Sequence, residues 1–376
     1  MKLDRYQRHE LIDWFPSEVV KNAQFAIIGC GAVGNEVAKN LALLGVGHLS
    51  LYDFDKIELH NLTRSVLFRE SDVGRSKAEV AATRSADLDP NIRVEYHHGD
   101  FWDTLSLDEV RGLDGVICCV DNFEARLKLS RLTQITSVNL INTGIDSRYA
   151  VVEVFPFSSK SGYACYECNL PDSAYERMRQ RYSCGWLKRV AFIEKKIPTT
   201  IVTSSACGAI AASHALRLLA ENQASDSSRV LLDTISGSST VSTLELNPSC
   251  PTCSAYQKPI HLVAATNLLD EGLLKDLDLP ENISVLVSDP ILLSHRCTNC
   301  TPEENEATVV FRRATDFDTD ITFCKDCNDE SVSVDIADMF SLGDLLRDYS
   351  GLRIPSKFAQ VETDSETIVI NLEGAS

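Results

Sequence analysis

The feature that most constrains this chain is a glycine-rich turn near its N-terminus. A short apolar run at 25–28 leads into Gly-Cys-Gly-Ala-Val-Gly at 29–34, a helix-like stretch to about Gly45, and a second apolar run ending in Asp53. Strand, glycine turn, helix and strand in this order are typical of a nucleotide-binding unit. We expect Asp53 to bind a ribose hydroxyl. Three glycines are predicted to let the backbone approach a phosphate at the helix N-terminus: Gly29, Gly31 and Gly34.

Polar residues behind the second apolar run favour ATP over a dinucleotide. The chain continues through Asp55, Asn61, Arg64 and Lys77, a set that hydride transfer does not need. Arginine and lysine neutralise phosphate oxygens, asparagine can hold a phosphate or ribose, and a carboxylate can hold Mg²⁺. Such a carboxylate is available at Asp121, which follows a third apolar run and is predicted to lie at the carboxyl edge of a parallel sheet.

Together these motifs resemble the E1-like activating enzymes of the ThiF, MoeB and HesA type, and the adenylation half of ubiquitin-activating enzymes. The resemblance covers about 1–258. It rests on the order and spacing of Arg5-Tyr6-Gln7-Arg8, 29–34, 53–55, 61–64, Lys77 and 118–122. It implies an enzyme that binds Mg-ATP and adenylates the C-terminal carboxylate of a ubiquitin-like protein or a peptide. The chain departs from the family at Ser65, where glutamine is usual, so one polar ATP contact differs.

The resemblance also implies roles for individual side chains. Arg64 and Lys77 are expected to stabilise charge on the phosphates, and Asp121 to hold Mg²⁺. Asp53 and Asn61 are expected to position the nucleotide. Arg8 is the candidate for a phosphate contact made from the other subunit of a homodimer. Taken alone, Arg5 and Arg8 are more typical of a solvated pair on a surface helix, and it is the resemblance that reverses this interpretation.

Cys184 is the candidate nucleophile. It lies in a polar, basic segment at 171–196, which matches the crossover loop of the resembled enzymes. Several of those enzymes carry there a cysteine that accepts the activated carboxylate as a thioester. Nearby Lys188 and Arg189 favour the thiolate by their charge. The alternative is a loop cysteine without an essential role, since some family members work without it.

Eight of the 13 cysteines fall into four C-x-x-C pairs, which is a spacing typical of zinc ligands. The resemblance implies a closed structural zinc site for the first two pairs: Cys165, Cys168, Cys250 and Cys253. The spacing of the other two predicts a zinc ribbon or knuckle pair: Cys297, Cys300, Cys324 and Cys327. The N-terminus lacks a signal peptide, so we expect a reducing cytoplasm rather than disulfides.

The predicted fold class is α/β, with a Rossmann-like, mainly parallel sheet covered by helices on both faces. A small zinc-binding α+β domain is expected to follow. We place the boundary between an adenylation domain at 1–258 and an acidic C-terminal domain at 259–376, where the composition changes. The order of elements in the second domain loosely resembles the ubiquitin-fold domain with which E1 enzymes bind an E2. A domain that binds substrate or stabilises a dimer is the alternative.

Net charge and hydropathy argue against two classes of partner, nucleic acids and membranes. The formal net charge of −18 argues against general nucleic-acid binding, and no apolar run is long enough to span a membrane. The extra C-terminal domain suggests that the product is passed to another protein, so we favour a ubiquitin-like carrier, with transfer to a partner such as an E2-like protein. Activation of a sulfur-carrier protein or of a ribosomal peptide is the first alternative. An NAD-dependent oxidoreductase and a non-enzymatic binding protein are two further alternatives.

Overall fold

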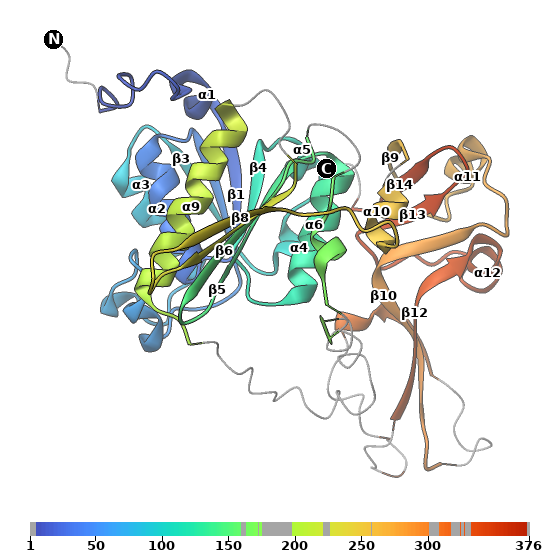
Figure 1. Cartoon of the computed structure of the whole chain (residues 1–376). Coiled ribbons are helices and arrows are strands. Elements are labelled where there is room, and N and C mark those ends of the chain that lie inside the picture. Colours follow the sequence, from blue (N-terminus) through green and yellow to red (C-terminus); the bar gives the residue numbers. More distant parts are fainter. Residues whose placement is uncertain are drawn as a thin grey trace. The chain divides into compact units, whose positions relative to one another are not determined.

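The computed structural model describes residues 5–158, 163–171, 173–174, 198–220, 226–256, 258–300, 308–316, 324, 327 and 332–373. They form two compact units, which Figure 1 shows in sequence colours. Among the described residues, the first unit contains those up to 170 and 198–254, and the second contains 171, 173–174 and those from 255 onward. The predicted domain boundary after residue 258 stays a prediction.

The first unit is built on an eight-stranded sheet in the order β3-β2-β1-β4-β5-β6-β7-β8. The first five strands in this order run parallel and the last three are antiparallel. The mainly parallel sheet predicted from the sequence is therefore confirmed. The strands are β1 (Gln24–Ile28), β2 (His48–Asp53), β3 (Arg93–His98), β4 (Gly115–Cys118), β5 (Asn139–Ile145), β6 (Tyr149–Phe155), β7 (Ser228–Asp233) and β8 (Ser239–Thr243).

Helices cover both faces of this sheet (Figure 1). One face carries α1 (Ser17–Asn22), α2 (Ala32–Leu44), α3 (Lys77–Leu88) and α9 (Ile201–Ala220). The other carries α4 (Phe101–Thr104), α5 (Leu107–Arg111) and α6 (Phe123–Thr136). Short helices lie in the connections: η1 (Leu59–Thr63), η2 (Glu70–Asp72), η3 (Tyr166–Asn169) and α10 (Pro251–Tyr256).

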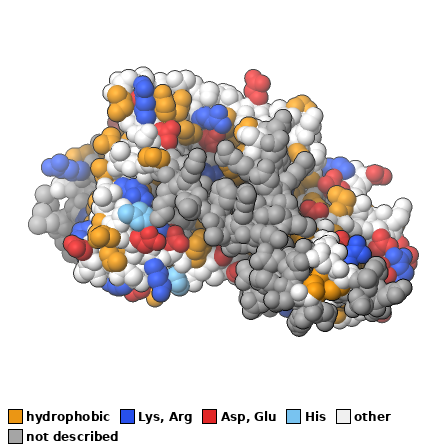
Figure 2. All heavy atoms as spheres, turned by 90° about the horizontal axis from the view of Figure 1, so that it is seen from below, with side chains coloured by type: hydrophobic (Ala, Val, Ile, Leu, Met, Phe, Trp, Pro, Cys, Tyr) orange, Lys and Arg blue, Asp and Glu red, His pale blue; other side chains and the backbone are white. Residues whose placement is uncertain are grey.

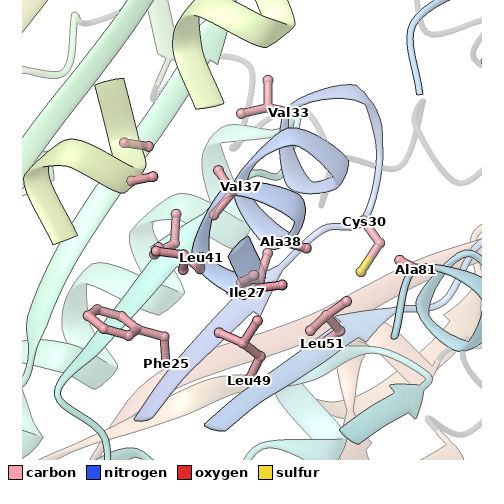
Figure 3. Packing of buried hydrophobic residues seen from close by; sticks show 14 of the residues in the cluster. Phe25, Ile27, Cys30, Val33, Val37, Ala38, Leu41, Leu49, Leu51 and Ala81 are labelled. Carbon is pink, nitrogen blue, oxygen red and sulfur yellow. The ribbon is translucent and has the colours of Figure 1, made fainter. Parts of the chain in front are cut away.

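The core explains why β1 is apolar from Phe25 to Ile28. Phe25 and Ile27 pack on the face that carries α2, together with Val37 and Leu41 of that helix (Figure 3). Alternate residues of a strand point to opposite faces, so Ala26 and Ile28 face the opposite helical layer. All of β1 from Phe25 to Ile28 is at most 1% exposed. Burial on both faces is expected of a parallel strand between two helical layers.

The second unit is an α+β structure, as predicted. Its strands are β9 (Ile260–Ala264), β10 (Ser284–Cys297), β11 (Thr308–Arg313), β12 (Val332–Ser341), β13 (Phe358–Glu362) and β14 (Thr367–Asn371). They form a sheet in the order β11-β10-β13-β14-β9, in which β12 also pairs with β10. The helices are α11 (Glu271–Leu277), α12 (Leu342–Asp348) and η4 (Ala314–Asp316). A buried core includes Val285, Leu345 and Ile368.

The strand pairing of this unit differs from that of ubiquitin itself, and the loose likeness to a ubiquitin-fold domain suggested by the order of elements stays a prediction. A ubiquitin fold begins with an antiparallel hairpin of its first two strands. Here, within the described residues, β9 pairs in parallel with β14 at the edge of the sheet, and β10 pairs with β11, β12 and β13. Element order along the chain is similar, but strand pairing is not, because pairing depends on contacts far apart in sequence.

The distribution of charged and apolar side chains on the surface, and the length of the apolar helices, bear on possible partners. On the face shown in Figure 2, the described acidic and basic side chains are interspersed, and hydrophobic ones lie singly or in small groups. In the ranges that the structure covers, we find no helix long and apolar enough to cross a bilayer.

Candidate active site

The predicted nucleotide residues gather where the strand order of the first unit reverses. From β1 the chain proceeds to β2 and β3 on one side, then returns to β4 and β5 on the other. The glycine turn follows β1, and Asp121 follows β4, which pairs directly with β1. In open α/β sheets, ligands bind at the carboxyl ends of the strands at this switch point. The sequence prediction that these two loops share one edge is therefore supported by the strand order.

Glycine fits the three positions of the turn for different physical reasons. Gly29 has φ +92°, and a Cβ there would lie 2.8 Å from the carbonyl oxygen of Cys119. A Cβ on Gly34 would lie 1.9 Å from the Gly29 carbonyl oxygen, so this residue lets α2 approach the strand closely. A Cβ on Gly31 would meet nothing within 4 Å. Two glycines thus serve packing, and Gly31 borders open space at the N-terminus of α2.

The N-terminus of α2 is suited to an anion. Gly31 is its N-cap residue and supplies no capping side chain. The first N–H groups of a helix lack intrahelical partners and carry a positive partial charge. The 13-residue helix therefore presents uncapped donors next to the space above Gly31. This arrangement fits the phosphate contact predicted from the sequence.

Replacing Gly34 and Gly31 by alanine should separate packing from phosphate binding. Gly34→Ala is expected to lower the free energy of unfolding by about 1–3 kcal/mol, because the new methyl collides with backbone. Gly31→Ala should cost less than about 1 kcal/mol of stability, but weaken ATP binding by about tenfold, because its methyl occupies the phosphate approach. Urea unfolding and calorimetric ATP titration measure the two effects. Equal ATP affinity in the wild type and Gly31→Ala would contradict the assignment.

Asp53 links the end of β2 to the glycine turn. One carboxylate oxygen accepts a hydrogen bond from the Cys30 N–H at 2.7 Å, and the other accepts from the Asp55 N–H at 2.7 Å. Burial raises the pKa of the Asp53 carboxyl above its ordinary value, while Lys77 and these two donors oppose the shift. The side chain therefore shapes the turn in addition to its predicted role in ribose binding, which stays a prediction.

Lys77 and Asp55 are brought together. Lys77 is the first residue of α3, and its ammonium group lies 2.6 Å from a carboxylate oxygen of Asp55. The lysine side chain is 13% exposed and the aspartate 50%. A largely buried lysine beside Asp55 supplies positive charge at the switch point of the sheet, where phosphate oxygens need it.

Asn61 and Arg64 lie on the segment between β2 and α3. Asn61 is buried in η1, where its side-chain oxygen accepts from the Glu58 N–H at 2.9 Å. Arg64 donates to the carbonyl oxygen of His60 at 2.8 Å. Both side chains therefore stabilise η1 locally, and their nucleotide contacts stay predictions.

Arg8 is exposed, whereas its neighbours in the motif hold the N-terminal segment to the first unit. Arg5 donates to the Leu88 carbonyl oxygen at 2.6 Å, and the Tyr6 hydroxyl donates to a carboxylate oxygen of Asp89. Both arginines are exposed, but Arg5 is tied to the carbonyl of Leu88, and the exposure of Arg8 is compatible with its predicted role in trans. Cys184 lies outside the described residues, as do Lys188 and Arg189.

The eight predicted zinc ligands form two clusters, in each of which all four sulfur atoms lie within 4.8 Å of one another. A tetrahedral zinc ion with Zn–S bonds of about 2.3 Å holds its sulfurs about 3.8 Å apart. In the first cluster the Cys165–Cys250 and Cys168–Cys253 separations are 3.6 and 3.4 Å. In the second, the Cys297–Cys327 and Cys300–Cys324 separations are 3.5 and 3.7 Å. Both clusters could hold a zinc ion.

Comparison with known proteins decides the family. The ThiF family model matches residues 7–255, about two thirds of the chain. This chain belongs to the ThiF family. The E1-like resemblance drawn from the motifs is therefore confirmed, and the match includes the glycine turn, Lys77, Asp121 and the first cysteine cluster.

Individual relatives agree with this family. A ubiquitin-like modifier-activating enzyme 5 from Drosophila virilis is 32% identical over 196 residues, which cover 49% of this chain and 48% of the relative. The same enzyme from Bombyx mori is 30% identical over 195 residues, 49% and 48% of the two chains. The chain thus spans about half the length of the curated relatives it matches.

Solved structures show the same fold. Escherichia coli MccB with succinimide has a TM-score of 0.54 at 23% identity, over 67% of this chain and 74% of that chain. Escherichia coli MccB with ATP has a TM-score of 0.52 at 22% identity, over the same shares. At this level of identity the likeness is one of fold.

Two residues that support the site were missed from the sequence. The buried Asn35 side chain donates to the carbonyl oxygens of Cys30 and Gly31 at 2.7 and 3.0 Å and accepts from the Leu67 N–H at 2.9 Å. It therefore ties the glycine turn to the segment that follows Arg64. The second residue is Arg126, whose guanidinium donates to the carbonyl oxygen of Val120 after β4 and to oxygens of Asn142 and Thr143 on β5. A polar residue inside an otherwise apolar helical face is the signal that could have indicated Asn35.

Proposed function

We propose that this protein is an E1-like enzyme that adenylates the C-terminal carboxylate of a ubiquitin-like protein at the expense of ATP. The observation that carries the proposal is the arrangement at the switch point. Asp121 follows the strand paired with β1, and an open glycine turn with an uncapped helix N-terminus lies after β1 itself. Membership of the ThiF family supports the same chemistry.

The reaction needs no general base, because a carboxylate is ionised and nucleophilic at neutral pH. A carboxylate oxygen of the carrier attacks the α-phosphorus of ATP. The bond from this phosphorus to the bridging oxygen of the β-phosphate breaks, and pyrophosphate leaves with the electron pair. The products are an acyl-adenylate and pyrophosphate. Catalysis then depends on positioning the reactants and on neutralising phosphate charge.

Each side chain has a proposed part in this step. Asp53 and Asn61 position the nucleotide, and Arg64 and Lys77 stabilise charge on its phosphates. Arg8 of a second copy in a homodimer adds a further cation. The exposed Asp121 carboxylate is a hard oxygen donor of the kind that Mg²⁺ prefers. When bound there, Mg²⁺ supplies positive charge to the phosphate oxygens.

We further propose a second chemical step after adenylation. Cys184 attacks the acyl-adenylate, AMP leaves, and the carrier becomes thioester-linked to the enzyme. Residues 1–258 act as the adenylation domain, with a structural zinc ion in the first cysteine cluster. Residues 259–376, with zinc in the second cluster, bind an E2-like partner or the substrate. Sulfur-carrier proteins and ribosomal peptides are the alternative substrates, since the adenylation chemistry is the same.

Intact mass spectrometry tests this proposal. The purified protein is mixed with Mg-ATP and candidate carriers, with and without a thiol reductant. An adduct of carrier mass that reductant removes, and that Cys184→Ala lacks, is the expected result. Pyrophosphate release without an adduct would limit the protein to adenylation and remove Cys184 from the mechanism. Protection against thermal unfolding by NAD but not by Mg-ATP would instead favour an oxidoreductase.

A further inference from the structure

Arg126 holds the backbone that leads into Asp121. This arginine lies in the first turns of α6, and its guanidinium donates three hydrogen bonds to groups outside the helix. It donates to the Val120 carbonyl oxygen, to the side-chain oxygen of Asn142 at 2.5 Å, and to the Thr143 carbonyl oxygen at 2.5 Å. Val120 immediately precedes Asp121, so one of these bonds acts on the residue next to the predicted magnesium ligand.

Other contacts leave this loop little freedom. The Cys119 N–H donates to the Ile28 carbonyl oxygen at 2.7 Å, which continues the pairing of β4 with β1. The side chain of Asn122 accepts from the Ala125 N–H at 2.8 Å and caps α6. The loop is therefore held before and after Asp121, and the bond from Arg126 to Val120 holds it between these two points.

Arg126 is itself held by a polar network that crosses the sheet. The Asn142 amide group donates to Glu153 at 2.7 Å, and Arg229 donates twice to the other oxygen of Glu153, at 2.8 and 2.6 Å. Glu153 and Asn142 are 5% and 4% exposed. Hydrogen bonds of this kind are strong in a buried setting and restrict the side chains that make them.

We propose that Arg126 is a positioning residue that sets the place of the Asp121 carboxylate relative to the glycine turn, and so sets the affinity for Mg-ATP. The inference rests on the proposed function, because it takes Asp121 as the magnesium ligand. Arg126 acts through the backbone, since its hydrogen bonds go to Val120, Asn142 and Thr143 and none goes to the Asp121 carboxylate.

The chemistry of the contact explains why arginine is required. Its planar guanidinium can donate in several fixed directions at once, whereas a lysine ammonium is a compact point charge on a flexible stem. Lysine at this position keeps the charge but cannot reproduce three directed bonds to acceptors on two strands. Arg229→Lys is the matched control, because both bonds of Arg229 go to one oxygen of Glu153 on β6, and a lysine there can still donate to this carboxylate and so keep the network that holds Arg126.

Calorimetric titration of the full-length protein tests the inference without a carrier. Arg126→Lys is expected to weaken Mg-ATP binding by about tenfold, as is typical when a group supporting a metal ligand is changed. Binding of ATP in the presence of a metal chelator should change less than about twofold, and Arg229→Lys should leave both affinities within about twofold of the wild type. In an Asp121→Asn background, Arg126→Lys should have no further effect on Mg-ATP binding.

Two results would overturn the inference: wild-type Mg-ATP affinity in Arg126→Lys, or an equal loss of Mg-ATP and metal-free ATP affinity in both arginine variants. Arg126→Gln provides a second variant if the lysine variant does not fold. Failure of the adenylation proposal gives a different pattern, in which the wild type binds Mg-ATP but forms no adenylate with any carrier. A wild type that does not bind Mg-ATP at all would overturn both.

Discussion

Replacing Asp121 with alanine is expected to reduce ATP–pyrophosphate exchange by more than about 100-fold. The carboxylate is exposed at the carboxyl edge of β4, beside the strand that carries the glycine turn. Its removal takes away the hard oxygen donor proposed for Mg²⁺, and the phosphate charge that develops as pyrophosphate leaves is then poorly neutralised. Because the side chain is exposed, the free energy of unfolding should change by less than about 0.5 kcal/mol.

The matched control for this variant is Asp87→Ala. Asp87 is also an exposed aspartate of the first unit, but it lies near the C-terminal end of α3, outside the proposed site. It should retain wild-type exchange. Exchange at near wild-type rate in Asp121→Ala would show that this residue is not the magnesium ligand.

Replacing Cys165 with serine should remove one of the two zinc ions that the cysteine clusters are proposed to hold. Cys165 is fully buried, and its sulfur lies 3.9 Å from that of Cys168 and 3.6 Å from that of Cys250. Zinc binding in structural sites contributes directly to folding, so the free energy of unfolding should fall by about 3 kcal/mol or more.

Metal analysis and urea unfolding measure these two effects. Cys297→Ser should lose the other zinc ion. Cys207→Ala is the control, because Cys207 is a buried cysteine of α9 outside both clusters, and this variant should keep both ions. Wild-type protein without zinc, or a Cys165→Ser variant that retains both ions, would contradict the assignment.

Much of the first unit was predictable because its signals are local. The glycine turn is encoded within a few residues, and the close approach of Gly34 to the Gly29 carbonyl oxygen follows directly from a strand, a turn and a helix in succession. Asp53 and Asp121 were predictable for a related reason. Each follows an apolar run, and parallel strands bring their carboxyl ends to one edge.

The supporting contacts could not be predicted in the same way. Asn35 reaches Leu67, which is 32 residues away, and Arg126 reaches Asn142 and Thr143 on a neighbouring strand. These bonds depend on side-chain directions that exist only after the sheet and helices have packed. The pairing of β9 with β14 depends likewise on contacts between residues about a hundred positions apart, so the order of elements along the chain does not indicate it.

The most direct test of the central claim is the mass of a candidate carrier after incubation with the Cys184→Ala variant and Mg-ATP, because this variant cannot pass the adenylated carrier on to the proposed thioester. The account predicts a carrier heavier by one AMP group, formed with release of pyrophosphate, and no change in a carrier whose C-terminal residue has been removed. Asp121→Ala should give neither product. A carrier that gains no AMP, under conditions where the wild type binds Mg-ATP, would contradict the account.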